Sequence, residues 1–168
     1  MNFWFRRSLI FTMAILSAVA VFSFDGRLAA QTPWPPGPPI TGNDQRNSLN
    51  LVKGQVQWLQ NSTRTASNYG AGGYDLVRSQ FEKLRGAYGA FRRTLSPRQL
   101  DFGANDLAEL DAGLDIIQEA FMVFENDVAN GRSYSSALRS MCQVLGQAAP
   151  IWLKELNQVS TRLRVGFP

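Results

Sequence analysis

The most constraining feature of this chain is a heptad pattern of apolar residues between Tyr74 and Val128. Two runs share the spacing 3, 4, 3, 4, 3, 4: Tyr74, Val77, Phe81, Leu84, Tyr88, Phe91 and Leu95, and then Leu107, Leu110, Leu114, Ile117, Phe121, Phe124 and Val128. Residues spaced in this way stay on one side of an α-helix and need partner helices to cover them. The pattern therefore predicts an all-α fold of packed helices.

Breaks in the pattern divide the chain into four predicted helices. Their ranges are 44–66, 74–95, 107–130 and 133–164. Asn43 is the expected N-cap of the first helix and Ser133 that of the last. A glycine-rich break lies at 68–73, and Ser96-Pro97 starts a short turn over 97–102, so the third helix can begin near 97 or near 107. Short joints make successive helices antiparallel, which predicts an up-down-up-down four-helix bundle.

The first and last helices have apolar inner faces of their own. These are Leu49, Val52, Val56, Leu59, Thr63 and Ala66 on the first, and Leu138, Met141, Leu145, Ala148, Trp152, Leu156, Val159 and Leu163 on the last. Pro150 lies inside the last helix, where it lacks an N–H group and is expected to kink the helix. Because pockets form between bundle helices, Met141 and Trp152 are the candidate lining of an apolar pocket at this kink.

Charges on the middle helices predict how these helices pair. Residues 101–127 hold eight acids and no base, whereas residues 78–98 hold six bases and one acid. Folding the two helices antiparallel about residue 101 places Arg92 opposite Asp111, Arg85 opposite Gln118 and Arg78 opposite Glu125. The same register pairs the core residues Leu95 with Leu107, Tyr88 with Leu114 and Phe81 with Phe121. Agreement between charge and core is expected of a foldable sequence.

The N-terminal segment, residues 1–30, is predicted to be a secretory signal. Arg6 and Arg7 precede an apolar run over 8–24, and the small residues Ala29 and Ala30 mark the expected cleavage point. An uncleaved anchor helix is the alternative, because the run is about the minimum length that spans a bilayer. Residues 31–42 form a proline-rich linker that favours an extended conformation. The predicted helical domain then covers residues 43–168.

Composition excludes several classes of activity. The chain has no histidine, which removes the usual zinc and haem ligands, the Ser-His-Asp triad and the commonest general base near neutral pH. Of 17 bases and 13 acids, three bases and one acid lie in the signal, so the remaining chain carries 14 and 12, or +2. This near-neutral balance argues against nucleic-acid binding. Cys142 is the only cysteine, so no internal disulfide forms; it is either a small buried side chain or an intermolecular link.

Several residues outside the inner faces are candidate contacts. Leu51 and Trp58 lie seven residues apart, away from the core stripe of the first helix, and Trp34 lies in the proline-rich linker. The small residues Gly86, Gly89 and Ala90 lie on the side of their helix away from its stripe. These small residues are either tolerated defects of the helix, or room for a close helix crossing inside the bundle, or a smooth outer surface. Exposed apolar lines usually mark interfaces, although Trp34 could instead fold back onto Trp58.

The sequence thus predicts an exported, non-catalytic helical module, periplasmic or extracellular, that works through protein–protein or self-association surfaces. We expect no cofactor and no metal, and membrane contact only through an uncleaved N-terminal segment. The alternative is a bundle that binds a small ligand in the Met141–Trp152 pocket. A protein partner or a homo-oligomer both fit the first prediction, and the sequence identifies neither.

Overall fold

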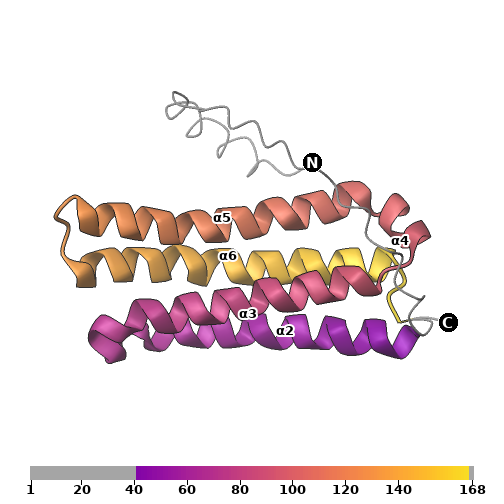
Figure 1. The fold of residues 1–168 in the computed structure, drawn as a ribbon, viewed down its shortest axis with the longest axis horizontal. Helices are drawn as coiled ribbons and strands as arrows, with labels where there is room; N and C mark the ends of the chain where they lie inside the picture. Colours follow the sequence, from indigo (N-terminus) through magenta and orange to yellow (C-terminus); the bar gives the residue numbers. More distant parts are fainter. Residues whose placement is uncertain (1–40, 167–168) are drawn as a thin grey trace, which may run out of the picture. The chain divides into compact units, whose positions relative to one another are not determined.

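The computed structural model describes residues 41–166, and this part of the chain is helical and contains no strand. It has four long helices (Figure 1), which are α2 (Gly42–Thr65), α3 (Gly73–Thr94), α5 (Ala104–Ala129) and α6 (Tyr134–Arg162). The 3-10 segment η2 (Ala66–Gly72) joins α2 to α3, and the short helix α4 (Pro97–Phe102) precedes α5. The expectation of an all-α fold is confirmed. The predicted signal over 1–30 and Trp34 lie outside the described residues.

Helix α2 begins two residues earlier than the sequence pattern suggested. Thr41, and not Asn43, is the N-cap, because its hydroxyl accepts a hydrogen bond from the Asp44 backbone N–H, 3.3 Å away. The Asp44 carboxylate accepts in return from the Thr41 backbone N–H at 2.9 Å, which completes a capping box. This backbone hydrogen bond is the main reason that the pKa of Asp44 is lowered.

The joint before α5 resolves the question of where the third long helix begins. Ser96 and Gln99 form a capping box on the short helix α4, as Ser96-Pro97 indicated. Helix α5 then starts at Ala104 and not near 107. A Cβ atom at Gly103 would lie 2.6 Å from the Leu163 side chain, so a larger residue there would displace Leu163 in the C-terminal segment. Asp106, in the first turn of α5, pairs with Arg162 at 2.9 Å.

Helix α6 runs without interruption from Tyr134 to Arg162, through Pro150. Ser133 occupies the N-cap position, but its side chain accepts no capping hydrogen bond. Gly131 has φ of +87°, which lets the chain turn after α5 in a conformation that favours glycine.

The predicted inner faces are buried with three exceptions, and they form one continuous core. Tyr74, in the first turn of α3, is only half-buried. The other two exceptions are Val128 and Ala148. Val128 is 36% exposed, since it lies in the last turn of α5 beside the connecting loop. On α6 the buried small residue is Ala149, whereas Ala148 is only half-buried. Both differences fall where a strict heptad count drifts from the true helical repeat of about 3.6 residues.

Three helix pairs share close backbone contact, namely α2 with α3, α5 with α6, and α2 with α6. The Gln45 side chain on α2 donates to the Thr94 carbonyl at the end of α3, 2.8 Å away. Figure 1 shows α5 and α6 on one side of the molecule and α2 and α3 on the other. Helices α3 and α5 meet through large rings, such as Phe81 stacked on Phe121 with centroids 5.2 Å apart.

Candidate functional site

Ion pairs between α3 and α5 follow the register that the charges predicted. Arg92 contacts Asp111 at 2.5 Å, and Arg78 pairs with Glu125. The predicted contact of Arg85 with Gln118 is wrong, because Arg85 turns back along its own helix to Glu82, 3.9 Å away. An oppositely charged partner one turn away competes well with a neutral amide across the helices.

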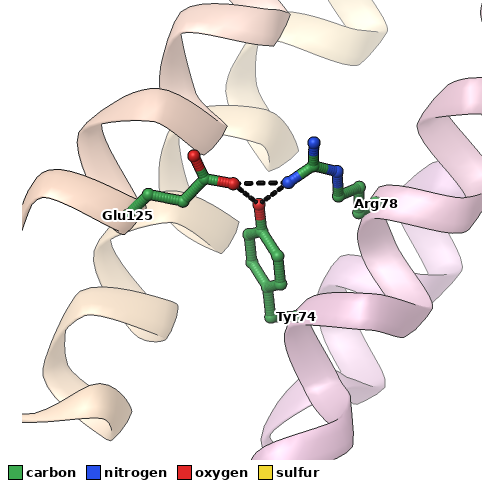
Figure 2. Close-up of polar contacts among 3 residues, drawn as sticks. All are labelled: Tyr74, Arg78 and Glu125. Atoms are coloured by element: carbon green, nitrogen blue, oxygen red, sulfur yellow. Dashed lines mark hydrogen bonds and ion pairs between the residues drawn. The ribbon is translucent and has the colours of Figure 1, made fainter. Parts of the chain in front are cut away.

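A polar cluster of Tyr74, Arg78 and Glu125 joins α3 to α5 (Figure 2). Tyr74 donates its hydroxyl hydrogen to Glu125, and Arg78 donates to the same hydroxyl oxygen at 2.5 Å. Burial, and then the hydrogen bond to Glu125, raises the pKa of Tyr74 to about 12. The hydrogen bond from Tyr74 lowers the pKa of Glu125.

These shifts determine what the cluster can do chemically. At neutral pH the phenol stays protonated and the carboxylate stays charged, so neither group is ready to exchange a proton with a substrate. Tyr74 also stacks on Phe124 with centroids 4.5 Å apart, which fixes its ring. The cluster therefore joins α3 to α5 and has a structural role.

Trp152 and Met141, the candidate pocket residues, are both core residues. Trp152 is 2% exposed, and its indole N–H donates to the Leu110 carbonyl at 2.8 Å. The ring fits against α5 because residue 113 is glycine, where a Cβ atom would lie 2.6 Å from the Trp152 ring. Tyr88 covers the ring edge-on, with centroids 5.4 Å apart. Leu110, Gly113 and Tyr88 thus contact the Trp152 side chain and bury it in the core.

The hollow beside Pro150 faces outward and does not contain Trp152. Its volume is about 440 Å³, and its lining is Pro150, Leu153, Lys154, Asn157, Gln158 and Thr161, all from α6. A surface lined by a single helix offers few convergent groups to a ligand.

Leu51 and Trp58 are exposed, as their spacing predicted. Leu51 is 53% exposed and Trp58 62%. Gly42 and Arg46 contact Gly166 in the C-terminal segment and so mark one flank of α2. At 100° per residue, Leu51 and Trp58 lie on the opposite flank, which is the flank next to α3.

Gly86, Gly89 and Ala90 lie level with this line along the axis of α3. The hydrogen bond from Gln45 to Thr94 sets an antiparallel register in which paired residue numbers add to about 139, which brings Leu51 level with the segment 86–90. A Cβ atom at Gly86 would meet nothing within 4 Å, so the interpretation as a close crossing inside the fold is wrong there. The outer-surface interpretation stays a prediction.

Lys83 and Arg93 add positive charge to this surface. Thr94, as the acceptor from α2, marks the α2 flank of α3, and Lys83 lies three helical turns before it on that flank. We call the combined surface the α2/α3 face. Its members are Leu51, Trp58, Lys83, Gly86, Ala90 and Arg93.

A second apolar surface, which the sequence pattern did not predict, lies between α5 and α6. It is a groove of about 180 Å³ that we call the α5/α6 groove. Its lining includes Ile116, Glu119, Ala120, Val123, Asp127, Ala137, Ser140 and Val144. Ile116 and Val123 lie seven residues apart, and so do Val144 and the exposed Ile151. The spacing that singled out Leu51 and Trp58 would have found these lines too.

Two further groups, Glu155 and Cys142, have raised pKa values. Burial, and then the charge of Glu109, raises the pKa of Glu155 at the edge of the α5/α6 pair. Burial also raises the pKa of the Cys142 thiol, which disfavours the reactive thiolate. Within residues 41–166, no three metal-ligating side chains gather at one point, and no helix there combines the length and apolar character needed to cross a membrane.

Comparison with models of protein families, with curated proteins and with solved structures found no match for this chain. A function is therefore inferred from the α2/α3 face and the α5/α6 groove.

Proposed function

We propose that this protein is an exported, non-catalytic helical module that works by binding protein through its outer faces. In this proposal residues 43–168 form an antiparallel up-down-up-down four-helix bundle, and residues 1–30 are a signal removed after Ala30. The short joints and the paired contacts of α2 with α3 and of α5 with α6 support the bundle. The basic, apolar and small-residue order of the N-terminus supports export.

One observation carries the binding function, namely the position of the exposed apolar side chains. Six of the large hydrophobic residues with high exposure fall in three lines of seven-residue spacing on two faces. These residues are Leu51, Trp58, Ile116, Val123, Val144 and Ile151. Single exposed apolar residues are common on any protein, but ordered lines on one face mark interaction surfaces.

The polar groups favour binding over catalysis. Tyr74, Arg78 and Glu125 are engaged with one another between two helices. The pKa of Glu155 is raised by burial and by the charge of Glu109, which is another acid. Trp152 fills the interior where a ligand pocket would have to form.

The test compares Trp58→Glu with Phe102→Glu in the full-length gene product, purified from its own host. Both residues are exposed aromatics, but Phe102 lies in α4, outside the two faces. Native mass spectrometry should show the wild-type chain, starting at Gln31, in an assembly with protein. We expect Trp58→Glu to lose that assembly with an unchanged circular dichroism melt, and Phe102→Glu to keep it.

Two results would contradict the proposal. A monomer that carries a bound small molecule would favour a ligand-binding bundle. Unfolding of Trp58→Glu would show that Trp58 is a core residue and not a contact residue.

A further inference from the structure

We propose that the partner is a second copy of this chain, and that the α2/α3 face of one copy docks into the α5/α6 groove of the next. This inference depends on the proposed function and adds the identity and geometry of the partner. It rests on three matched properties of the two surfaces: spacing, charge and orientation.

The apolar lines match in spacing. Leu51 and Trp58 are seven residues apart on α2, as are Ile116 and Val123 on α5. Seven helical residues rise about 10.5 Å. The two large side chains on the α2/α3 face are therefore separated, along the helix axis, by the same distance as the two large side chains on each side of the groove. The groove floor contains the small residues Ala120, Ala137 and Ser140, which leave room between these lines.

The charges match in sign. In residues 41–166, Lys83 and Arg93 on the α2/α3 face form no ion pair, and Glu119 in the α5/α6 groove forms none either. Arg78, by contrast, is paired between α3 and α5. The three bases of α6, Arg139, Lys154 and Arg162, do not line the groove.

Glu109 lies seven residues before Ile116 on α5, and its charge acts on Glu155, so this pair of acids continues the negative charge beyond one end of the groove. Their mutual repulsion contributes to the raised pKa of Glu155. A cation from a docking surface would relieve this repulsion, and the α2/α3 face supplies two. Complementary potentials of this kind set the orientation of an association and speed it.

The two surfaces point in opposite directions. Helices α5 and α6 form one side of the molecule, and α2 and α3 form the other (Figure 1). A copy that donates its α2/α3 face therefore keeps its own groove free on the far side. Contacts of this heterologous kind do not close on themselves in pairs but continue from copy to copy.

The available area is sufficient for a specific contact. Helix α2 has 24 residues, which at 1.5 Å per residue gives a face about 36 Å long and roughly 20 Å wide for two helices, or on the order of 700 Å². Stable interfaces of standard size bury about 600–1,000 Å² on each partner, so this face lies within that range. The central aromatic residue, Trp58, is of the type that dominates binding energy at such contacts.

The experiment disables each surface in turn in the full-length product and then mixes the two variants. Trp58→Glu blocks the α2/α3 face, and Val123→Lys blocks the groove. Both side chains are exposed, so the folds should survive, which thermal melts would verify. Phe102→Glu, in α4, is the control for an added charge at an exposed aromatic position.

Sedimentation velocity supplies the readout. The wild-type chain should form a series of species that grows with concentration, and either single variant should have a dissociation constant raised about 30-fold or more. An equal mixture of the two variants should give a 1:1 dimer that does not grow, because only one intact junction remains. High salt should weaken association, since exposed charges are screened.

Three outcomes would overturn self-docking. Val123→Lys that still dimerises would show that two α2/α3 faces pair with each other. A monomeric wild type in which Trp34→Ala makes Trp58 more accessible to a fluorescence quencher would show that the proline-rich linker covers this face. A monomeric wild type with no effect of Trp34→Ala would leave only a different protein as partner. In that case the assembly lost by Trp58→Glu still tests the proposed function by itself.

Discussion

Trp152 and Trp58 are the same residue type in two different environments: Trp152 is buried in the core, and Trp58 is exposed on the α2/α3 face. In the interior, Trp152 donates its indole hydrogen to the Leu110 carbonyl and packs against Gly113 and Tyr88. On the α2/α3 face, Trp58 is 62% exposed. The interior tryptophan is therefore explained by the fold, whereas the outer tryptophan requires an explanation outside it.

Truncating the two tryptophans should break the molecule in one region and spare it in the other. We expect Trp152→Ala to lower the free energy of unfolding by about 3–5 kcal/mol, because it opens a cavity in a packed core. Trp58→Ala should change this free energy by less than about 0.5 kcal/mol, as is usual for surface positions. Urea denaturation of the dilute chain, where association is weakest, measures both. Equal losses would show that Trp58 is packed in solution.

Two glycines sharpen the same comparison with a smaller effect. Gly113→Ala would place a methyl group 2.6 Å from the Trp152 ring, so we expect a loss of about 1–3 kcal/mol from overpacking. Gly86→Ala on the α2/α3 face meets nothing within 4 Å, and alanine favours helices by about 1 kcal/mol over glycine. Thermal unfolding should therefore show opposite shifts in melting temperature for the two variants. A stabilising Gly113→Ala would mean that the Trp152 ring is not tightly held by α5.

The interior was largely predictable from the sequence because apolar burial leaves a periodic record. Phe81 and Phe121 stack where the heptad register paired them, and Arg92 meets Asp111. Arg85 instead pairs with Glu82 on its own helix. A register that compares only residues on two different helices does not include such partners within one helix. The cap at Thr41 was missed because Asn43 is an equally good cap by residue type, and only the returning Asp44 carboxylate decides between them.

The outer surfaces were predictable only in part. Leu51 and Trp58 were found from spacing, but the α5/α6 groove was not, because Ile116 and Val123 lie next to a strong core stripe that masks them. A pocket at Pro150 was expected because Trp152 was read as lining a gap. The ring instead fills the space left by Gly113, whose role depends on a partner 39 residues away in the chain.

The smallest effect concerns paired against unpaired acids, and it depends on pH. The pKa of Glu125 is lowered from its usual value of 4.5, chiefly by the hydrogen bond from Tyr74. A depressed folded-state pKa contributes stability that is present above about pH 4.5 and is lost as pH falls through the lower folded value. Because Glu125 and Arg78 are about half exposed, we expect Glu125→Gln to cost only about 0.2–1 kcal/mol near neutral pH. Glu119→Gln, which changes an unpaired acid on the same helix, should cost no measurable free energy of unfolding in the dilute chain.

Unfolding free energies measured from pH 7 to pH 3 should converge for wild type and Glu125→Gln as the pH falls. If the gap between them stays constant instead, the cluster of Tyr74, Arg78 and Glu125 gains no stability from the charge of Glu125. In that case the aromatic rings and the Arg92–Asp111 pair hold α3 against α5.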